Sequence, residues 1–439
     1  MNKKIEEYSS VINRLFGPHE SIEKGVKTIT FQVTEDCCLN CTYCYQHNKS
    51  KKVMTFDVAK KAIDDILERS DRVKDYIDSY DTAGVIIDFI GGEPFMAIDL
   101  ISDVSEYFIK RLIELDHPWR NRFRFSICSN GALYFQPKVQ EYLKKYFNHV
   151  GFSISIDGNK ELHDACRIFP DGSGSYDTAM SAVRHYVDVL GGHMGSKMTL
   201  APENVLYTYD AVVSLIENGY DSINLNCVYE EGWQLEHAKI LYAQLKKVAD
   251  YLIEHDLVEE IPLSIFDEVH GHADTNDRNW CGGTGLMLAI DPDGRYFPCL
   301  RYMGSSLGGK REPYSIGDVT CGIGKTTTCK DRLNCLNCIT KSSQSTEKCM
   351  TCPIASGCGW CSAYNYEVYG TPNKRATFIC QMHQARTLAT AYLWNTWYRK
   401  IDSDKRYSLD IPKDWALEIV DEKEFNHLME VSVDEPNNS

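Results

Sequence analysis

Two patterns of hydrophobic positions take turns along residues 26–256. In segment 26–34, Ile29, Phe31 and Val33 alternate with polar neighbours, which predicts a half-buried strand. In segment 56–69, apolar residues recur at helical spacing, which predicts an amphipathic helix. The two patterns then repeat, and we expect further strands at 85–90, 123–128, 150–156, 196–200 and 222–228, and helices at 100–115, 137–146, 176–190, 211–218 and 236–255.

Six strand–helix units in a row indicate one class of fold. Neighbouring parallel strands are joined by crossover connections. These connections usually contain a helix and are almost always right-handed. We therefore expect an α/β fold, a partial (β/α)6 barrel of the TIM-like kind. Several strands end in polar or glycine-rich turns, such as Gly91-Gly92 and Ser129-Asn130-Gly131. Because the chemistry of such barrels takes place at the carboxyl ends of the strands, the functional residues are expected there.

The character of the chain changes after about residue 260. The segment from Cys281 to Cys380 is rich in loops and contains eleven of the eighteen cysteines. Metal binding rather than apolar burial is therefore expected to organise it. A last long helix is predicted at 386–398. We expect four regions: an N-terminal segment (1–25), a barrel (26–260), a cysteine-rich domain (261–399) and an acidic tail (400–439).

The composition of the chain limits which cellular compartment and which classes of binding partner are expected. The 439 residues include 47 Lys and Arg against 62 Asp and Glu, and the resulting charge of −15 argues against broad contacts with nucleic acids or anionic membranes. No secretory signal and no membrane span are visible in the sequence. We therefore expect a cytoplasmic protein with no membrane or nucleic-acid partner. In a reducing compartment, clustered thiols are more often metal ligands or catalytic groups than disulfides.

The first cluster of cysteines follows the first predicted strand. Cys37, Cys41 and Cys44 have the spacing CxxxCxxC. Three such thiolates can hold three irons of a [4Fe-4S] cube and leave the fourth iron without a protein ligand, where chemistry can take place. The alternative is a structural metal site or a fortuitous cysteine-rich loop.

The residues around this loop resemble those of the radical S-adenosylmethionine (SAM) family. In that family the cysteine motif follows the first barrel strand and has an aromatic residue, here Tyr43, before its last cysteine. Ser155 and Arg167 lie in a stretch similar to the family's SxDG–HD–R pattern, in which the serine and the arginine meet SAM. The resemblance implies a barrel of the radical SAM type, with one [4Fe-4S] cluster and bound SAM. The family's GGEP motif, which binds the amino group of SAM, is matched by Gly91, Gly92, Glu93 and Pro94.

The cysteine-rich domain resembles the SPASM extension of the same family, which carries two auxiliary [4Fe-4S] clusters. One residue fewer than usual separates Cys358 from Cys361. Family members with a fully ligated near cluster have a further cysteine between the first ligand and the glycine that follows it, and none lies between Cys281 and Gly294. The near cluster would therefore have an open iron, unless a thiol from Cys321, Cys329, Cys335 or Cys338 fills it. The resemblance implies three ligands for a near cluster, Cys281, Cys299 and Cys361, and four for a far cluster, Cys349, Cys352, Cys358 and Cys380.

Zinc is the competing interpretation of this domain. Two CxxC pairs could bind one zinc ion in a four-thiolate knuckle, formed by Cys335, Cys338, Cys349 and Cys352. A chain of that kind would be a non-enzymatic zinc-binding interaction protein.

The greatest similarity is to radical SAM enzymes that mature ribosomally made peptides, and it covers roughly residues 26–390. It implies a Cys-rich precursor peptide as substrate and a flavodoxin- or ferredoxin-like electron donor. The implied reaction is formation of a thioether, of the sactipeptide or ranthipeptide type, after hydrogen abstraction by a 5′-deoxyadenosyl radical. An anaerobic sulfatase-maturing enzyme, which forms formylglycine, shares the cluster motifs and is the alternative enzyme.

Overall fold

Four neighbouring parallel strands form the sheet of the N-terminal part of the protein. The computed structural model describes residues 25–44, 46, 49–220, 222–274, 276–277, 281–285 and 287–430. The strands pair in chain order: β1 (Val26–Gln32), β2 (Gly84–Ile90), β3 (Phe123–Ser129) and β4 (Val150–Ile154). Helices of the predicted kind follow them: α2 (Phe56–Leu67), α3 (Ile98–Glu114), α4 (Pro137–Lys145) and α6 (Tyr176–Arg184). The predicted α/β class and its parallel sheet are confirmed.

The last two barrel strands form a separate pair. β5 (Gly195–Leu200) and β6 (Ser222–Cys227) are parallel to each other, and they are followed by α7 (Thr208–Glu217) and α8 (Leu235–Glu254). In the described residues, no strand pairing joins β4 to β5. At this junction the N–H of Ile154 donates to the sulfur of Met194 at 3.4 Å rather than to a neighbouring strand. The six units therefore occur in the predicted order, but the sheet is interrupted after the fourth.

The sheet also extends in a direction that was not predicted. β7 (Met287–Ile290) pairs in parallel with β1, on the side away from β2. The antiparallel strands β8 (Arg295–Phe297), β9 (Gly317–Asp318) and β10 (Gly322–Ile323) then complete an eight-stranded sheet. The beginning of the cysteine-rich segment therefore shares the sheet of the barrel, which its loop-rich sequence did not indicate.

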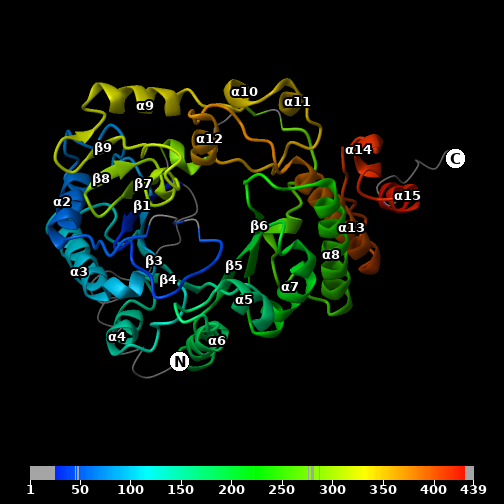
Figure 1. Ribbon diagram of the computed structural model, residues 1–439, viewed down its shortest axis with the longest axis horizontal. Helices are drawn as coiled ribbons and strands as arrows, with labels where there is room; N and C mark the ends of the chain where they lie inside the picture. Colours follow the sequence, from blue (N-terminus) through cyan, green and yellow to red (C-terminus); the bar gives the residue numbers. More distant parts are fainter. Residues whose placement is uncertain are drawn as a thin grey trace.

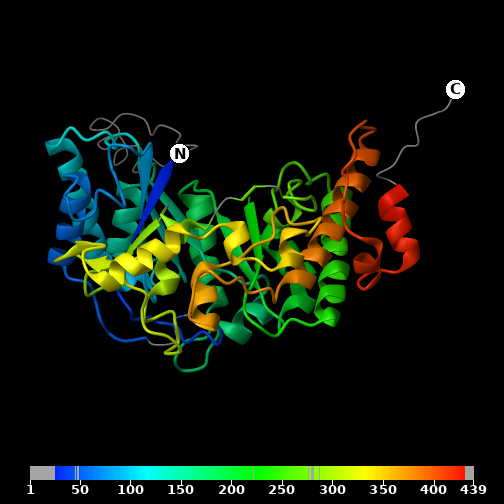
Figure 2. The ribbon, with the colours of Figure 1, turned by 90° about the horizontal axis from the view of Figure 1, so that it is seen from above.

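Short helices lead from this sheet to the far end of the molecule (Figures 1 and 2). They are α9 (Thr327–Asn337), α10 (Lys341–Gln344), α11 (Glu347–Met350) and α12 (Ser362–Tyr369). α13 (Cys380–Lys400) begins six residues before its predicted start and packs along α8. No helix among the described residues has both the length and the apolar character needed to cross a membrane.

The segment predicted as an acidic tail contains two helices. α14 (Lys413–Leu417) and α15 (Glu422–Glu430) pack against α13. Glu424 of α15 accepts hydrogen bonds from Tyr242 at 2.6 Å and from Lys246 at 2.5 Å, both on α8. The packing against α13 and the two hydrogen bonds to α8 fix residues 413–430 to the two long helices.

The barrel strands bury their apolar side chains under the helices and turn polar side chains to the inner face of the sheet. On β3, Phe123 and Phe125 are fully buried and pack against Phe108 of α3, whereas Arg124 and Cys128 on the opposite face are exposed. On the same inner face, the hydroxyl of Thr30 donates to Asp88 at 3.3 Å. A polar inner face suits a bound polar ligand better than the packed side-chain layers of a complete TIM barrel do.

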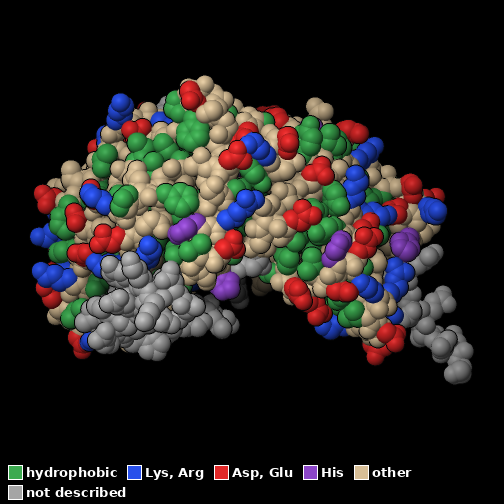
Figure 3. Space-filling model, turned by 90° about the horizontal axis from the view of Figure 1, so that it is seen from below, with side chains coloured by type: hydrophobic (Ala, Val, Ile, Leu, Met, Phe, Trp, Pro, Cys, Tyr) green, Lys and Arg blue, Asp and Glu red, His purple; other side chains and the backbone are tan. Residues whose placement is uncertain are grey.

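Charges of both signs are paired over the outer surface. Arg111 of α3 contacts Asp64 at 2.9 Å and Glu114 at 2.7 Å, and it also pairs with Glu68. On the described part of the face in Figure 3, acidic and basic side chains are interspersed. Ion pairs at a solvated surface contribute little to stability, so the core and the sites below carry the structural account.

Candidate active site

The cysteine loop, residues 37–44, lies against the glycine pair at the end of β2. The N–H of Gly92 donates to the carbonyl oxygen of Thr34 at 3.2 Å. A Cβ atom on Gly91 would lie 2.7 Å from that oxygen, and one on Gly92 would lie 2.4 Å from the carbonyl oxygen of Asp36. The two glycines are therefore required because the backbone of the loop packs directly against them.

The other side of the cysteine loop is tied to α5 (Lys160–Cys166) and the residues after it. The N–H of Asn40 donates to the carbonyl of Ile168 at 2.8 Å, and the N–H of Thr42 donates to that of Cys166 at 3.0 Å. Cys37, Cys41 and Cys44 are all half-buried. The loop that carries the three predicted cluster ligands is thus held from both sides.

Glu93 joins the end of β2 to the end of β3. Its side chain is fully buried, and Oε1 accepts hydrogen bonds from the Ser129 hydroxyl at 2.9 Å and the Phe95 N–H at 3.1 Å. Oε2 accepts one, from the N–H of Asn130 at 2.8 Å. Burial raises the pKa of Glu93 to about 7. Pro94, also buried, begins the short 3-10 helix that leaves this turn.

Asn130, in the turn after β3, supports the first cysteine. Its side-chain amide donates to the sulfur of Cys38 at 3.4 Å and to that of Cys37 at 3.8 Å, and the N–H of Leu39 donates to Cys37 at 3.4 Å. Hydrogen bonding, with Cys38 as the largest contributor, lowers the pKa of Cys37 to about 6. From the sequence, the Asn-Gly turn was only a weak signal, and Cys38 had no assigned role.

Tyr43 and Arg167 meet at Asp157. Arg167 donates to the two carboxylate oxygens at 2.8 and 3.3 Å, the Tyr43 hydroxyl donates to the same carboxylate, and the guanidinium lies 5.4 Å from the centre of the Tyr43 ring. Burial acts to raise the pKa of Asp157, but the Arg167 charge prevails and holds it below its usual range. In the sequence, Asp157-Gly158 is typical of a turn that ends a strand. Gly158 does have a φ of +93°, but the buried carboxylate that orients both side chains was missed.

Ser155 lies at the same level, beside the inner face. Its N–H donates to the carbonyl of Ser129 at 2.9 Å, and its hydroxyl lies 3.4 Å from the sulfur of Cys128. The residues predicted to meet SAM thus come from the carboxyl ends of β1, β2 and β4 and from the stretch after α5, around one end of the inner face.

The three cysteines predicted to hold the near cluster come together from separate segments; we call Cys281, Cys299 and Cys361 the near set. Burial raises the pKa of the Cys299 thiol, and the neighbouring thiols of Cys361 and Cys281 act in the same direction. The sulfur of Cys281 lies 3.2 Å from the hydroxyl of Ser362. Cys361 caps the N-terminus of α12.

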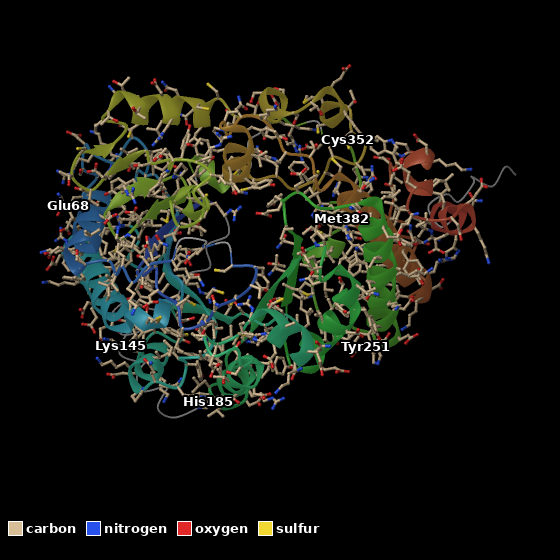
Figure 4. The ribbon with its side chains drawn as sticks, viewed as in Figure 1. Glu68, Lys145, His185, Tyr251, Cys352 and Met382 are labelled. Carbon is tan, nitrogen blue, oxygen red and sulfur yellow. The ribbon has the colours of Figure 1, made fainter. Side chains whose placement is uncertain are left out.

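The far set, Cys349, Cys352, Cys358 and Cys380, gathers at the other end of the cysteine-rich segment. Burial raises the pKa of Cys380 to about 11, and the thiols of Cys358 and Cys349 act in the same direction. Burial also raises the pKa of Cys352, and Cys349 adds to that shift. Nε2 of His383, near the start of α13, lies 2.6 Å from the carbonyl oxygen of Ile354, two residues after Cys352; Cys352 and Met382 are labelled in Figure 4.

The four cysteines between the two sets have other surroundings. Cys321 and Cys338 are exposed, the Cys329 thiol donates to the carbonyl of Ser315 at 3.8 Å, and Cys335 lies beside the hydroxyl of Tyr314. Cys349 and Cys352, in contrast, share their surroundings with Cys358 and Cys380. The contacts in the described residues thus give no support to a fourth near-set ligand from this group.

The near set and the cysteine loop lie at opposite ends of the inner face. Thr28, near the start of β1, pairs with Met287 at the start of β7, and the antiparallel β8 returns the chain to that level just before Cys299. The cysteine loop follows the other end of β1. Because β1 has seven residues and a strand rises about 3.3 Å per residue, the two ends are roughly 20 Å apart.

The donor groups fit iron–sulfur clusters. Among residues 25–430, apart from those the structure does not describe, no three or more His, Cys, Asp or Glu side chains converge as they would on a single metal ion. A four-iron cube is wider than one ion and takes thiolates at its corners. The thiols of the cysteine loop, the near set and the far set are the type of donor that such clusters take.

Comparison with known proteins gives a family match for one part of the chain. Residues 31–204 match the model of the Radical SAM superfamily. The uncharacterised protein MJ0907 of Methanocaldococcus jannaschii is 30% identical to this chain over an alignment of 202 residues. The alignment covers 46% of this chain and 63% of that relative's length. The radical SAM cyclopropyl synthase TigE of Paramaledivibacter caminithermalis is 24% identical, over an alignment that covers 84% of this chain and 74% of TigE.

A solved structure has the same fold. The structure of native anSMEcpe with bound AdoMet and the Kp18Cys peptide aligns with a TM-score of 0.62 at 16% identity, over 86% of this chain and 99% of that one. With the cysteine loop, the GGEP turn and the Tyr43–Asp157–Arg167 contact, these matches lead to one conclusion. Residues 31–204 carry a domain that matches the Radical SAM superfamily.

Proposed function

We propose that this chain is a radical SAM enzyme that joins a cysteine sulfur of a ribosomally made peptide to a carbon of another residue, forming a thioether. The observation that carries the proposal is the near set. It has three thiols rather than four, and it lies across the polar inner face from the cysteine loop. A peptide in the barrel can therefore reach both ends.

The residues at the carboxyl ends of the strands would hold the cofactors. Cys37, Cys41 and Cys44 would ligate the first cluster, and SAM would lie against the turn and side chains around them: Tyr43, Gly91, Gly92, Glu93, Pro94, Ser155 and Arg167. When bound, the reduced cluster and SAM supply a 5′-deoxyadenosyl radical that takes one hydrogen atom from the peptide. The ion pair with Asp157 fixes the direction of the Arg167 guanidinium, and burial fixes the carboxylate of Glu93.

The near and far sets would hold the auxiliary clusters. The peptide thiol loses its proton, the acceptor carbon has lost a hydrogen atom to deoxyadenosine, and one electron must leave when the carbon–sulfur bond closes. The vacant fourth position of the near set would bind the thiolate. The far set, which has four thiols, is complete and suits electron transfer alone.

Two other reactions use the same radical. TigE is a cyclopropyl synthase by name, and ring closure between carbons needs no substrate thiol. Formation of formylglycine from cysteine removes the sulfur altogether. Neither reaction explains why the near set should lack a fourth ligand.

Mass spectrometry of the product separates the three reactions. The holoenzyme is incubated without oxygen, with SAM, dithionite and a short cysteine-containing peptide. A thioether is expected to appear as the loss of two hydrogens for each crosslink and one fewer cysteine that iodoacetamide can alkylate. Loss of two hydrogens with all thiols still alkylated would indicate cyclopropane formation, and loss of sulfur would indicate formylglycine; either result overturns the proposal. The Cys37→Ala variant is the control and is expected to yield unmodified peptide.

A further inference from the structure

The far set is bordered by a buried guanidinium that contacts one of its sulfurs. Arg375 is 8% exposed, and its Nη2 donates to the sulfur of Cys358 at 3.0 Å and to the carbonyl oxygen of Cys358 at 3.1 Å. A buried charge is costly unless it has a partner. Among the described residues, Arg375 forms no ion pair with a carboxylate, and its guanidinium donates only to the sulfur and to the carbonyl oxygens of Cys358 and, at 3.5 Å, Gly359.

A second guanidinium approaches the same cysteine from α13. Arg386 donates to the carbonyl of Gly357 at 2.5 Å and meets Nδ1 of His383 at 2.7 Å, and its buried Nε has no hydrogen-bond partner among the described residues. No carboxylate of the described residues pairs with it. Burial raises the pKa of the Cys358 thiol, and the charges of Arg375 and Arg386 act in the opposite direction. Figure 4 shows this region of the molecule around Cys352 and Met382.

The near set has a different electrostatic environment. The cation beside Cys361 is Arg301, and it pairs with Glu230 at 3.0 Å and with Glu367 at 3.6 Å. Two carboxylates therefore offset its charge. The near set thus has one neutralised cation beside it. The far set has Arg375 and Arg386, which no described carboxylate offsets, and the charges of Lys341 and Lys348 act on Cys352 and Cys380 in the same direction.

We propose that Arg375 and Arg386 hold the reduction potential of the far cluster above that of the near cluster, and so direct the electron released in crosslinking outward. Reduction adds one negative charge to a cluster, and unpaired cations and hydrogen bonds to its sulfurs stabilise that charge. Closure of the carbon–sulfur bond from the carbon radical and the thiolate would leave one electron on the near cluster. The near cluster would then pass this electron to the far cluster and return to its oxidised state. The far cluster would in turn reduce an external one-electron acceptor of the flavodoxin or ferredoxin class. This inference rests on the proposed function, because it requires both auxiliary clusters.

Potentiometric titration of the full-length holoenzyme, followed by electron paramagnetic resonance, tests the inference. Signals are assigned with Cys281→Ala and Cys349→Ala, which remove the near and far clusters in turn. In the wild type, the far cluster is expected to become reduced at a higher potential than the near cluster. In Arg386→Gln, the ratio of reduced to oxidised far cluster at a fixed potential is expected to fall about tenfold, equivalent to about 59 mV for one electron.

Matched variants separate charge from structure. Arg375→Gln is expected to lower the far potential at least as much as Arg386→Gln, whereas Arg375→Lys, which keeps the charge, restores most of it. Arg184→Gln, exposed on α6, is expected to change nothing. The Arg375→Gln variant could fail to take up the far cluster, because Arg375 contacts the sulfur of Cys358. Arg386 makes no contact with that sulfur, so Arg386→Gln then tests whether the cations set the potential.

Two results would overturn the inference: a near potential above the far one in the wild type, or an unchanged far potential in a fully loaded Arg386→Gln variant. Iron and sulfide analysis distinguishes these from failure of the proposed function. Three cubes require about twelve of each per chain. A wild-type enzyme with about eight would lack an auxiliary cluster, and the cluster assignment itself would then be wrong.

Discussion

The barrel strands and the segment 339–379, which carries three far-set cysteines, differ in the kinds of side chain that they bury. On β1–β4 one face of each strand is apolar, and side chains such as Phe31, Phe89 and Phe125 are fully buried. In segment 339–379, buried polar side chains, among them Lys341, Asn365 and Arg375, are about as numerous as buried apolar ones. Burial of apolar surface therefore stabilises the barrel but cannot account for the fold of the second region.

Polar contacts and thiols define the shape of that second region. Asn365 donates to Gln344 at 3.2 Å and accepts from the N–H of Ala376 at 2.9 Å. The helices α10 and α11 have only four residues each and begin at threonine caps. Helices this short have little stability of their own. Under the proposed assignment, metal bound by the far set would stabilise this segment, whereas apolar burial stabilises the barrel.

Removal of iron is the largest expected disturbance of this contrast. Omitting iron during preparation is expected to speed amide exchange in segment 339–379 at least about tenfold, and to leave β1–β4 unchanged, because only the former depends on metal for its shape. Hydrogen exchange with mass spectrometry measures both regions in one sample.

A matched pair of thiol variants is the control for iron removal. Cys380→Ser, which removes a far-set ligand, is expected to reproduce the effect of iron removal in part. Cys338→Ser, at an exposed thiol outside both sets, is expected to leave exchange unchanged. Equal acceleration in the barrel would show that the two regions are not stabilised differently.

Within the barrel, a smaller effect is expected from the contact between the GGEP turn and the cysteine loop. In Gly92→Ala the new Cβ would lie 2.4 Å from a backbone oxygen, so the loop must shift, at a cost of about 2–3 kcal/mol in the free energy of unfolding. Formation of 5′-deoxyadenosine is expected to fall at least about tenfold, because the cluster ligands move with the loop. Urea unfolding and chromatography measure the two effects.

Gly151→Ala on β4 is the control for that variant. Its Cβ would have no neighbour closer than 3.6 Å, so stability and deoxyadenosine yield are expected to remain at or slightly above the wild-type values. If both variants lose activity equally, the close packing at Gly92 is not the reason for its glycine.

Hydrophobic periodicity predicted the barrel well because its physical cause is local. Alternation along residues 26–34 reflects one apolar face under the helices, and the structure has β1 at Val26–Gln32. The motif residues could also be placed, since each follows a strand and the carboxyl ends of parallel strands share one edge of the sheet. Glu93 and Ser155 accordingly lie at the same edge.

Contacts between distant segments could not be predicted in this way. The pairing of β7 with β1 joins Thr28 to Met287 across the length of the barrel, and four residues of β7 carry too little pattern to reveal it. Asp157 followed a strand but resembled a simple turn residue, because its partners Tyr43 and Arg167 are distant in the sequence. Arg375 and Arg386 showed no motif, and their role emerges only from burial without a carboxylate.

The central claim is that the near cluster receives the thiolate of the substrate, and spectroscopy of that cluster tests it most directly. In a variant with Cys37, Cys41 and Cys44 changed to alanine, no turnover occurs and the auxiliary clusters remain. Adding the cysteine-containing peptide is expected to change the electron paramagnetic resonance signal of the near cluster, while the same peptide with each cysteine changed to alanine leaves it unaltered. An unchanged signal with the cysteine peptide, or an equal change with both peptides, would contradict the account.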